Sequence, residues 1–85
     1  MGRKEKLIRR FLQLPKDFTF DEIITLLGYF DYKIDNKGAT SGSRASFKNT
    51  KTGVSINIHK PHPGPVMKEW MVKQIYLHLK NNSLI

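Results

Sequence analysis

The sequence predicts an α+β domain in which helices pack on one face of a three-stranded antiparallel sheet. After an N-terminal flanking helix, the expected order of elements is helix, strand, strand, strand, helix. Apolar residues recur at helical spacing near the N-terminus, before residue 30 and after residue 65, whereas three shorter segments between them alternate apolar and polar residues. The 85-residue chain has room for one core, and because it contains no cysteine, ordinary packing must hold that core.

Residues 3–13 form the first predicted helix, which ends before Pro15 because a residue that precedes proline disfavours helical geometry. Its apolar residues share one face: Leu7, Ile8, Phe11 and Leu12. We assign residues 1–15 to this flanking helix and residues 16–85 to the main domain.

A capping box predicts the start of the second helix. In Thr19-x-x-Glu22 the hydroxyl can accept from the Glu22 amide while the carboxylate reaches back to the Thr19 amide. The helix should run from about residue 20 to 29 or 30. The apolar stripe expected to face the core comprises Phe20, Ile23, Ile24, Leu27 and Phe30.

Three strands follow. Tyr32 and Ile34 alternate with polar residues in the first, and a tight turn is expected around Gly38. Residues 43–49 and 54–59 alternate in the same way and should form a hairpin whose turn spans residues 49–53. With Lys48 opposite Ser55, the register places Ser46 opposite Asn57 and Arg44 opposite His59.

The last helix is expected to begin after Gly64, with Pro65 at its first position, where no amide hydrogen is needed. Its inner stripe is Val72, Ile75 and Leu79, bordered by Met71 and Tyr76. Two long stripes can be buried together only on one face of so small a sheet. The other face should therefore carry Arg44, Ser46, Lys48, Ser55, Asn57 and His59.

The charge balance favours an anionic partner. Lys and Arg total 15 against 7 acidic residues, giving a net charge of +8 and a pI near 10.0. Nucleic acid, an acidic protein and an anionic membrane surface all fit, and a basic surface can also serve solubility alone. The sequence offers no apolar stretch that could span a membrane and no continuous apolar run typical of a signal peptide. With no cysteine to suggest an oxidising compartment, we expect a cytoplasmic protein.

Three motifs resemble landmarks of the HicA (YcfA-like) toxin family: the runs over residues 16–22, 38–44 and 59–64, the last reading His59-Lys60-Pro61-His62-Pro63-Gly64. The similarity covers roughly residues 16–85. It implies a double-stranded-RNA-binding-domain-like fold, ribosome-independent cleavage of mRNA, and neutralisation by a HicB-type antitoxin.

One position departs from the family pattern. The family typically has Gly-Ser-His at the start of the second strand, with the histidine taken as catalytic, whereas this chain reads Gly42-Ser43-Arg44. Arginine stays protonated near neutral pH, so Arg44 can hold phosphate or stabilise charge but cannot transfer the proton.

His59 is the remaining candidate for proton transfer, because alternation puts it on the open sheet face with Arg44. In the working hypothesis His59 transfers the proton and Arg44 binds the phosphate. The alternative is that His59 simply ends an exposed strand. Further RNA contacts are expected from Ser43, Ser46, Lys48, Asn57, Lys60 and His62. The pair His59 and His62 has no evident third ligand, so neither a metal nor another cofactor is expected.

Several other residues have two possible roles. Trp70 and Tyr76 could stack on bases, although aromatic residues at helical spacing more often serve a core or a partner contact. Lys68, Lys73 and Lys80 could extend a phosphate footprint or keep the surface soluble. His78 is expected to be a surface or border residue of the last helix. The predicted function is an mRNA endonuclease toxin; the alternatives are a non-catalytic RNA-binding module and an antitoxin-docking domain.

Overall fold

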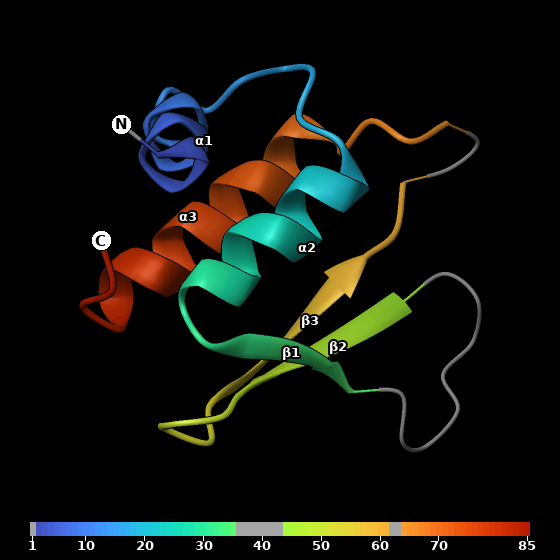
Figure 1. The fold of residues 1–85 in the computed structure, drawn as a ribbon. Coiled ribbons are helices and arrows are strands. Elements are labelled where there is room, and N and C mark those ends of the chain that lie inside the picture. The colour runs from blue at the N-terminus through green and yellow to red at the C-terminus, as the bar shows by residue number, and fades with distance from the viewer. Residues whose placement is uncertain (1, 36–43, 62–63) are drawn as a thin grey trace.

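The computed structural model describes residues 2–35, 44–61 and 64–85 and confirms the predicted α+β class. The elements, shown in Figure 1, are α1 (Arg3–Leu12), α2 (Phe20–Tyr29), β1 (Tyr32–Asp35), β2 (Arg44–Asn49), β3 (Ser55–His59) and α3 (Glu69–Asn81). The expected turn around Gly38 lies outside the described residues.

The strands form an antiparallel sheet in the order β1-β2-β3. The predicted hairpin register is confirmed: Lys48 lies opposite Ser55, Ser46 opposite Asn57, and Arg44 opposite His59. The turn between β2 and β3 is closed by the Gly53 amide, which donates to the Asn49 carbonyl at 2.9 Å. Gly53 has a φ of +78°, a conformation that favours glycine.

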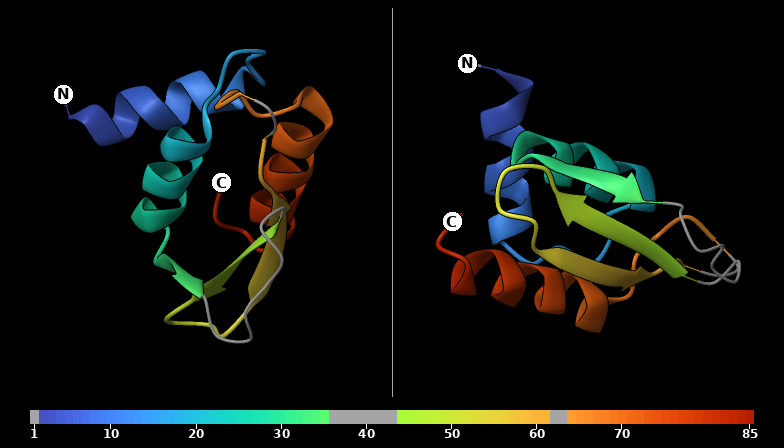
Figure 2. Two further views of the ribbon diagram at one scale, coloured as in Figure 1. Left: turned by 90° about the vertical axis from the view of Figure 1, so that its right-hand side faces the viewer. Right: turned by 90° about the horizontal axis from the view of Figure 1, so that it is seen from below.

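The chain is layered. Helices α2 and α3 lie side by side on one face of the sheet, and α1 crosses them on the side away from the sheet (Figures 1 and 2). Among the described residues no helix covers the other sheet face, which is nearest the viewer in the right panel of Figure 2. The core between the layers includes Phe18, Phe47, Ile58, Met71 and Ile75, all almost completely buried.

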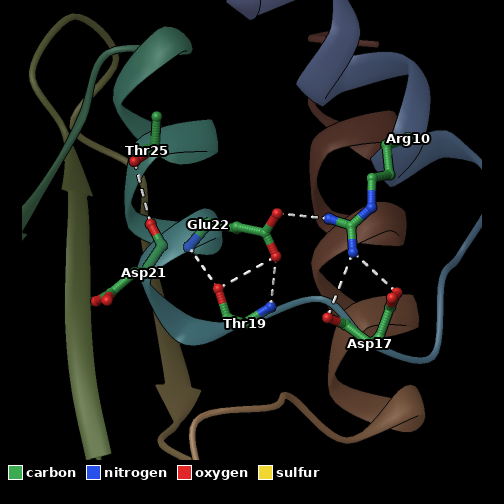
Figure 3. A network of polar contacts seen from close by, with 6 residues as sticks. All are labelled: Arg10, Asp17, Thr19, Asp21, Glu22 and Thr25. Carbon is green, nitrogen blue, oxygen red and sulfur yellow. Dashed lines mark hydrogen bonds and ion pairs between the residues drawn. The ribbon is translucent and has the colours of Figure 1, made fainter.

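Helix α2 begins at the predicted capping box, which the structure confirms. The Glu22 amide donates to the Thr19 hydroxyl oxygen at 3.2 Å, and the Thr19 amide donates to Glu22 Oε1 at 2.8 Å (Figure 3). Arg10 of α1 completes this network: its guanidinium donates to Glu22 Oε2 at 2.6 Å and to Asp17 Oδ1 at 2.8 Å. The capping box thus also fixes where α1 sits.

The predicted start of the last helix is wrong. Helix α3 begins at Glu69, because residues 65–67 first run alongside residues 18–20. The Phe20 amide donates to the Pro65 carbonyl at 2.9 Å, and the Met67 amide donates to the Phe18 carbonyl at 2.7 Å. Pro65 is suited to this extended pairing because the bond it makes uses its carbonyl and needs no amide hydrogen.

The predicted apolar faces also need corrections. In α2, Leu26 is fully buried, whereas Ile24 is 37% exposed, so the stripe is rotated from its expected place. Ile34 is 41% exposed although it lies opposite the buried Phe47, because β1 is an edge strand. In α1 only Phe11 is fully buried, and it contacts the rings of Phe18 and Tyr76.

Candidate functional site

The sheet face turned away from the helices is the candidate site. Its residues are brought into cross-strand rows by the pairing of β1, β2 and β3, and we call it the outer face: Lys33, Arg44, Ser46, Lys48, Ser55, Asn57 and His59. All of these side chains are exposed except Ser46, which is half-buried. Their strand neighbours Ala45, Phe47 and Ile58 are buried on the inner face, so the alternation expected from the sequence is realised.

One row pairs the two proposed catalytic residues. Arg44 is the first residue of β2, His59 is the last residue of β3, and the two are direct antiparallel partners. Directly opposite residues on one face hold their Cβ atoms about 5 Å apart. An exposed guanidinium and an exposed imidazole are therefore available to a single phosphodiester.

A second row concentrates positive charge. Lys33 of β1 lies opposite Lys48 of β2, which lies opposite Ser55 of β3. Two like charges in direct opposition destabilise a sheet, so an anion that bridges them would be favourable. Sequence reasoning missed Lys33 as a site residue; its alternation with Tyr32 signalled the outward position, but only the β1–β2 register places it beside Lys48.

The acidic residues with ion-pair partners lie elsewhere. In the described ranges, ion pairs join Arg10 to Asp17 and Glu22, and Lys51 to Asp31. Asp35 occupies a register position opposite Ser46. Among the residues whose side chains the structure describes, none of these ion pairs uses Lys33, Arg44 or Lys48.

The two histidines whose positions are described differ sharply. His59 is exposed, and its ring centroid is 5.6 Å from that of Trp70 in α3. His78 is half-buried beside the inner face, where its Nε2 shares a 2.7 Å hydrogen bond with the Tyr32 hydroxyl. Burial lowers the pKa of His78 and raises that of Tyr32, so both groups favour their neutral forms. Hence His78 joins α3 to β1, and His59 is the one placed to meet a ligand.

The other predicted site residues lie at the end of β3, at the start of α3 or outside the described residues. Lys60 follows β3 directly and is exposed, as is Lys68 at the start of α3. Ser43 and His62 lie outside the described residues. No cluster of three histidine, cysteine or acidic side chains with metal-site geometry occurs in residues 2–35, 44–61 and 64–85.

The described helices include none that is both long and apolar enough to cross a lipid bilayer. The outer face can bind an anion through its cationic side chains, and it can offer one imidazole for proton transfer.

The comparisons with known proteins identify one family. A family model described as the HicA toxin of bacterial toxin–antitoxin systems matches residues 20–82, which span α2 to α3 and include every strand. No curated protein and no solved structure matches the chain.

Proposed function

Because the chain belongs to the HicA toxin family of bacterial toxin–antitoxin systems, we propose that it is an RNA-binding toxin that cleaves messenger RNA in the cytoplasm without a metal ion. A HicB-type antitoxin is its proposed inhibitor. The order α2-β1-β2-β3-α3, with both helices on one side, is the order that the resemblance implies for a double-stranded-RNA-binding-domain-like fold.

The observation that carries the proposal is the Arg44–His59 row on the outer face. RNA cleavage without a metal needs a group for proton transfer and a cation beside the phosphate whose charge rises in the transition state. The row supplies both from adjacent strands of a packed sheet. Rigid elements hold such groups in place better than loops do.

In the proposed reaction the ribose 2′-hydroxyl loses its proton as its oxygen attacks phosphorus. The bond from phosphorus to the 5′-oxygen breaks, and the departing oxygen takes up a proton. His59 carries out one of these proton transfers and solvent water the other, and Arg44 stabilises the negative charge on the phosphate oxygens. Lys48, Lys33 and Lys60 bind neighbouring phosphates, with Ser46 and Asn57 as hydrogen-bonding groups between them.

A second function is favoured by one observation, the arginine at the position where the family pattern has histidine. If the change to Arg44 removed the nuclease chemistry, the chain would be a non-catalytic RNA-binding module. A related alternative is that the cationic outer face serves mainly to dock an acidic antitoxin.

Incubation of the purified protein with bulk RNA in EDTA separates the first two functions. Fragmented RNA supports the metal-independent nuclease, whereas bound but intact RNA supports the binding module. Absence of RNA binding at low salt leaves antitoxin docking as the role of the face. Induction of the isolated gene, with growth and transcript integrity followed together, tests toxicity in the cell.

A further inference from the structure

A hollow of about 220 Å³ lies where β3 ends and α3 begins. It is lined by residues of both segments: His59, Lys60, Pro61, Lys68, Trp70 and Met71. The proposed proton-transfer residue therefore forms one wall of a hollow that also holds two exposed lysines and the only tryptophan of the chain.

Trp70 does not take part in the core. Its side chain is 50% exposed, whereas its neighbours on the helix, Met71 and Val72, are almost completely buried. Exposing half of so large an apolar ring is unfavourable in water unless a partner covers it. The ring planes of Trp70 and His59 are inclined by 56°, so they form two walls of an open wedge and not a closed stack.

The chemistry of this hollow fits a nucleotide. An exposed indole offers a face on which a base can stack, and the ammonium groups of Lys60 and Lys68 can bind the phosphate attached to it. An acidic peptide would match the lysines but would leave the indole face without a matching flat group. The combination of aromatic and cationic walls therefore favours nucleic acid over an acidic protein.

We infer that Trp70 is the stacking platform for an unpaired nucleobase next to the phosphate held by Arg44 and His59. This inference rests on the proposed function and adds to it the form of the substrate. A base within a duplex is stacked on both faces and cannot reach the indole, so the platform selects single-stranded RNA. Trp70 thereby acts as a specificity-determining residue that positions the strand for cleavage.

Tryptophan fluorescence tests this directly, because all of the signal comes from Trp70. Four probes are titrated into the full chain: a short single-stranded 2′-O-methyl RNA, its duplex, an abasic strand of the same length, and poly-glutamate. The methylated ribose blocks the attacking hydroxyl, so binding is measured without cleavage. We expect strong quenching by the single strand and little by the duplex, the abasic strand or poly-glutamate.

Variants provide the second measurement. Trp70→Ala should weaken binding of the single strand by at least about fivefold and leave binding of the abasic strand unchanged. Trp70→Phe should restore part of the affinity, because a phenyl ring still stacks. Leu77→Ala is the matched control, since Leu77 is 43% exposed on the same helix but does not line the hollow. Thermal unfolding of each variant checks that the fold is retained.

The outcomes separate this inference from the proposed function. Single-stranded binding without quenching, and with Trp70→Ala equal to wild type, overturns the stacking platform but leaves RNA binding by the outer face intact. Equal quenching by the abasic strand would mean that the hollow binds only phosphate, and it would also overturn the stacking platform. Quenching by poly-glutamate alone assigns the hollow to a protein partner. Failure of every RNA probe to bind contradicts both proposals.

Discussion

His59 and Arg44 occupy the same row but have different chemical capacities. An imidazole can exchange a proton near neutral pH, whereas a guanidinium stays charged. We therefore expect His59→Gln to abolish cleavage while RNA affinity remains nearly unchanged, and Arg44→Ala to weaken both. Gel assays of cleavage and filter binding on the same preparations measure the two effects. Unchanged cleavage in His59→Gln would remove the mechanism but not the family assignment.

Glu22 shows how a single carboxylate ties stability to pH. Burial alone would raise the pKa of Glu22, but hydrogen bonds from Thr19 and Arg10 outweigh it and lower that pKa. A carboxylate whose pKa is lower in the folded state adds stability above its unfolded pKa, and that stability is lost as the pH falls through the folded value.

We expect Glu22→Gln to lower the melting temperature at pH 7, where the carboxylate is ionised. The difference in melting temperature from wild type should narrow as the pH falls below the ordinary glutamate pKa of 4.5 and through the lower folded value, because Glu22 then becomes protonated. Melting curves across this range provide the measurement, with Glu69→Gln as the control for an exposed carboxylate. A gap that stays constant down to acidic pH would show that the ion pair is not its source.

At the scale of the elements, Asn49 links α2 to the hairpin in a way that sequence reasoning did not identify. It is the last residue of β2 and is 2% exposed. Its side-chain amide donates to the Phe30 carbonyl at 2.9 Å, and its Oδ1 accepts from the amides of Lys51 and Thr52. The sequence marks Asn49 as a turn residue, and only the fold supplies the partner 19 residues away.

Asn49→Ala should therefore lower the free energy of unfolding by about 2 kcal/mol, because it removes three hydrogen bonds to part-buried backbone groups. Asn57→Ala is the matched control: its side chain is exposed on the outer face, and its loss should cost about 0.5 kcal/mol or less. Urea denaturation of the two variants gives both values. Equal midpoints would mean that the Asn49 contacts add no net stability.

For the molecule as a whole, the net charge of +8 is spread over faces with different roles. Lys48 lies on the outer face, whereas Lys4 lies in α1, on the far side of the helix layer (Figure 1). For single-stranded RNA, each phosphate contact adds about 0.7 to the slope of log affinity against log salt concentration.

Lys48→Ala should accordingly reduce the magnitude of that slope by about 0.7, while Lys4→Ala leaves it unchanged. Binding isotherms at several salt concentrations measure both slopes. Equal reductions in the two variants would indicate that the protein binds RNA through its overall charge and not through the outer face.

The sequence by itself determined the elements whose signals are local. Thr19 and Glu22 define the start of α2 because a capping box involves one turn of chain, and alternation in β2 and β3 assigns Arg44 and His59 to one face because the strand period is two. The hairpin register followed from the short turn between residues 49 and 53.

Tertiary structure alone decided the features that depend on distant partners. Residues 65–67 are extended and not helical because residues 18–20 pair with them, and Lys33 belongs to the outer face's cationic row because β1 pairs with β2. Trp70 meets His59 because α3 starts beside the end of β3. Each of these contacts joins segments that sequence periodicity describes only one at a time.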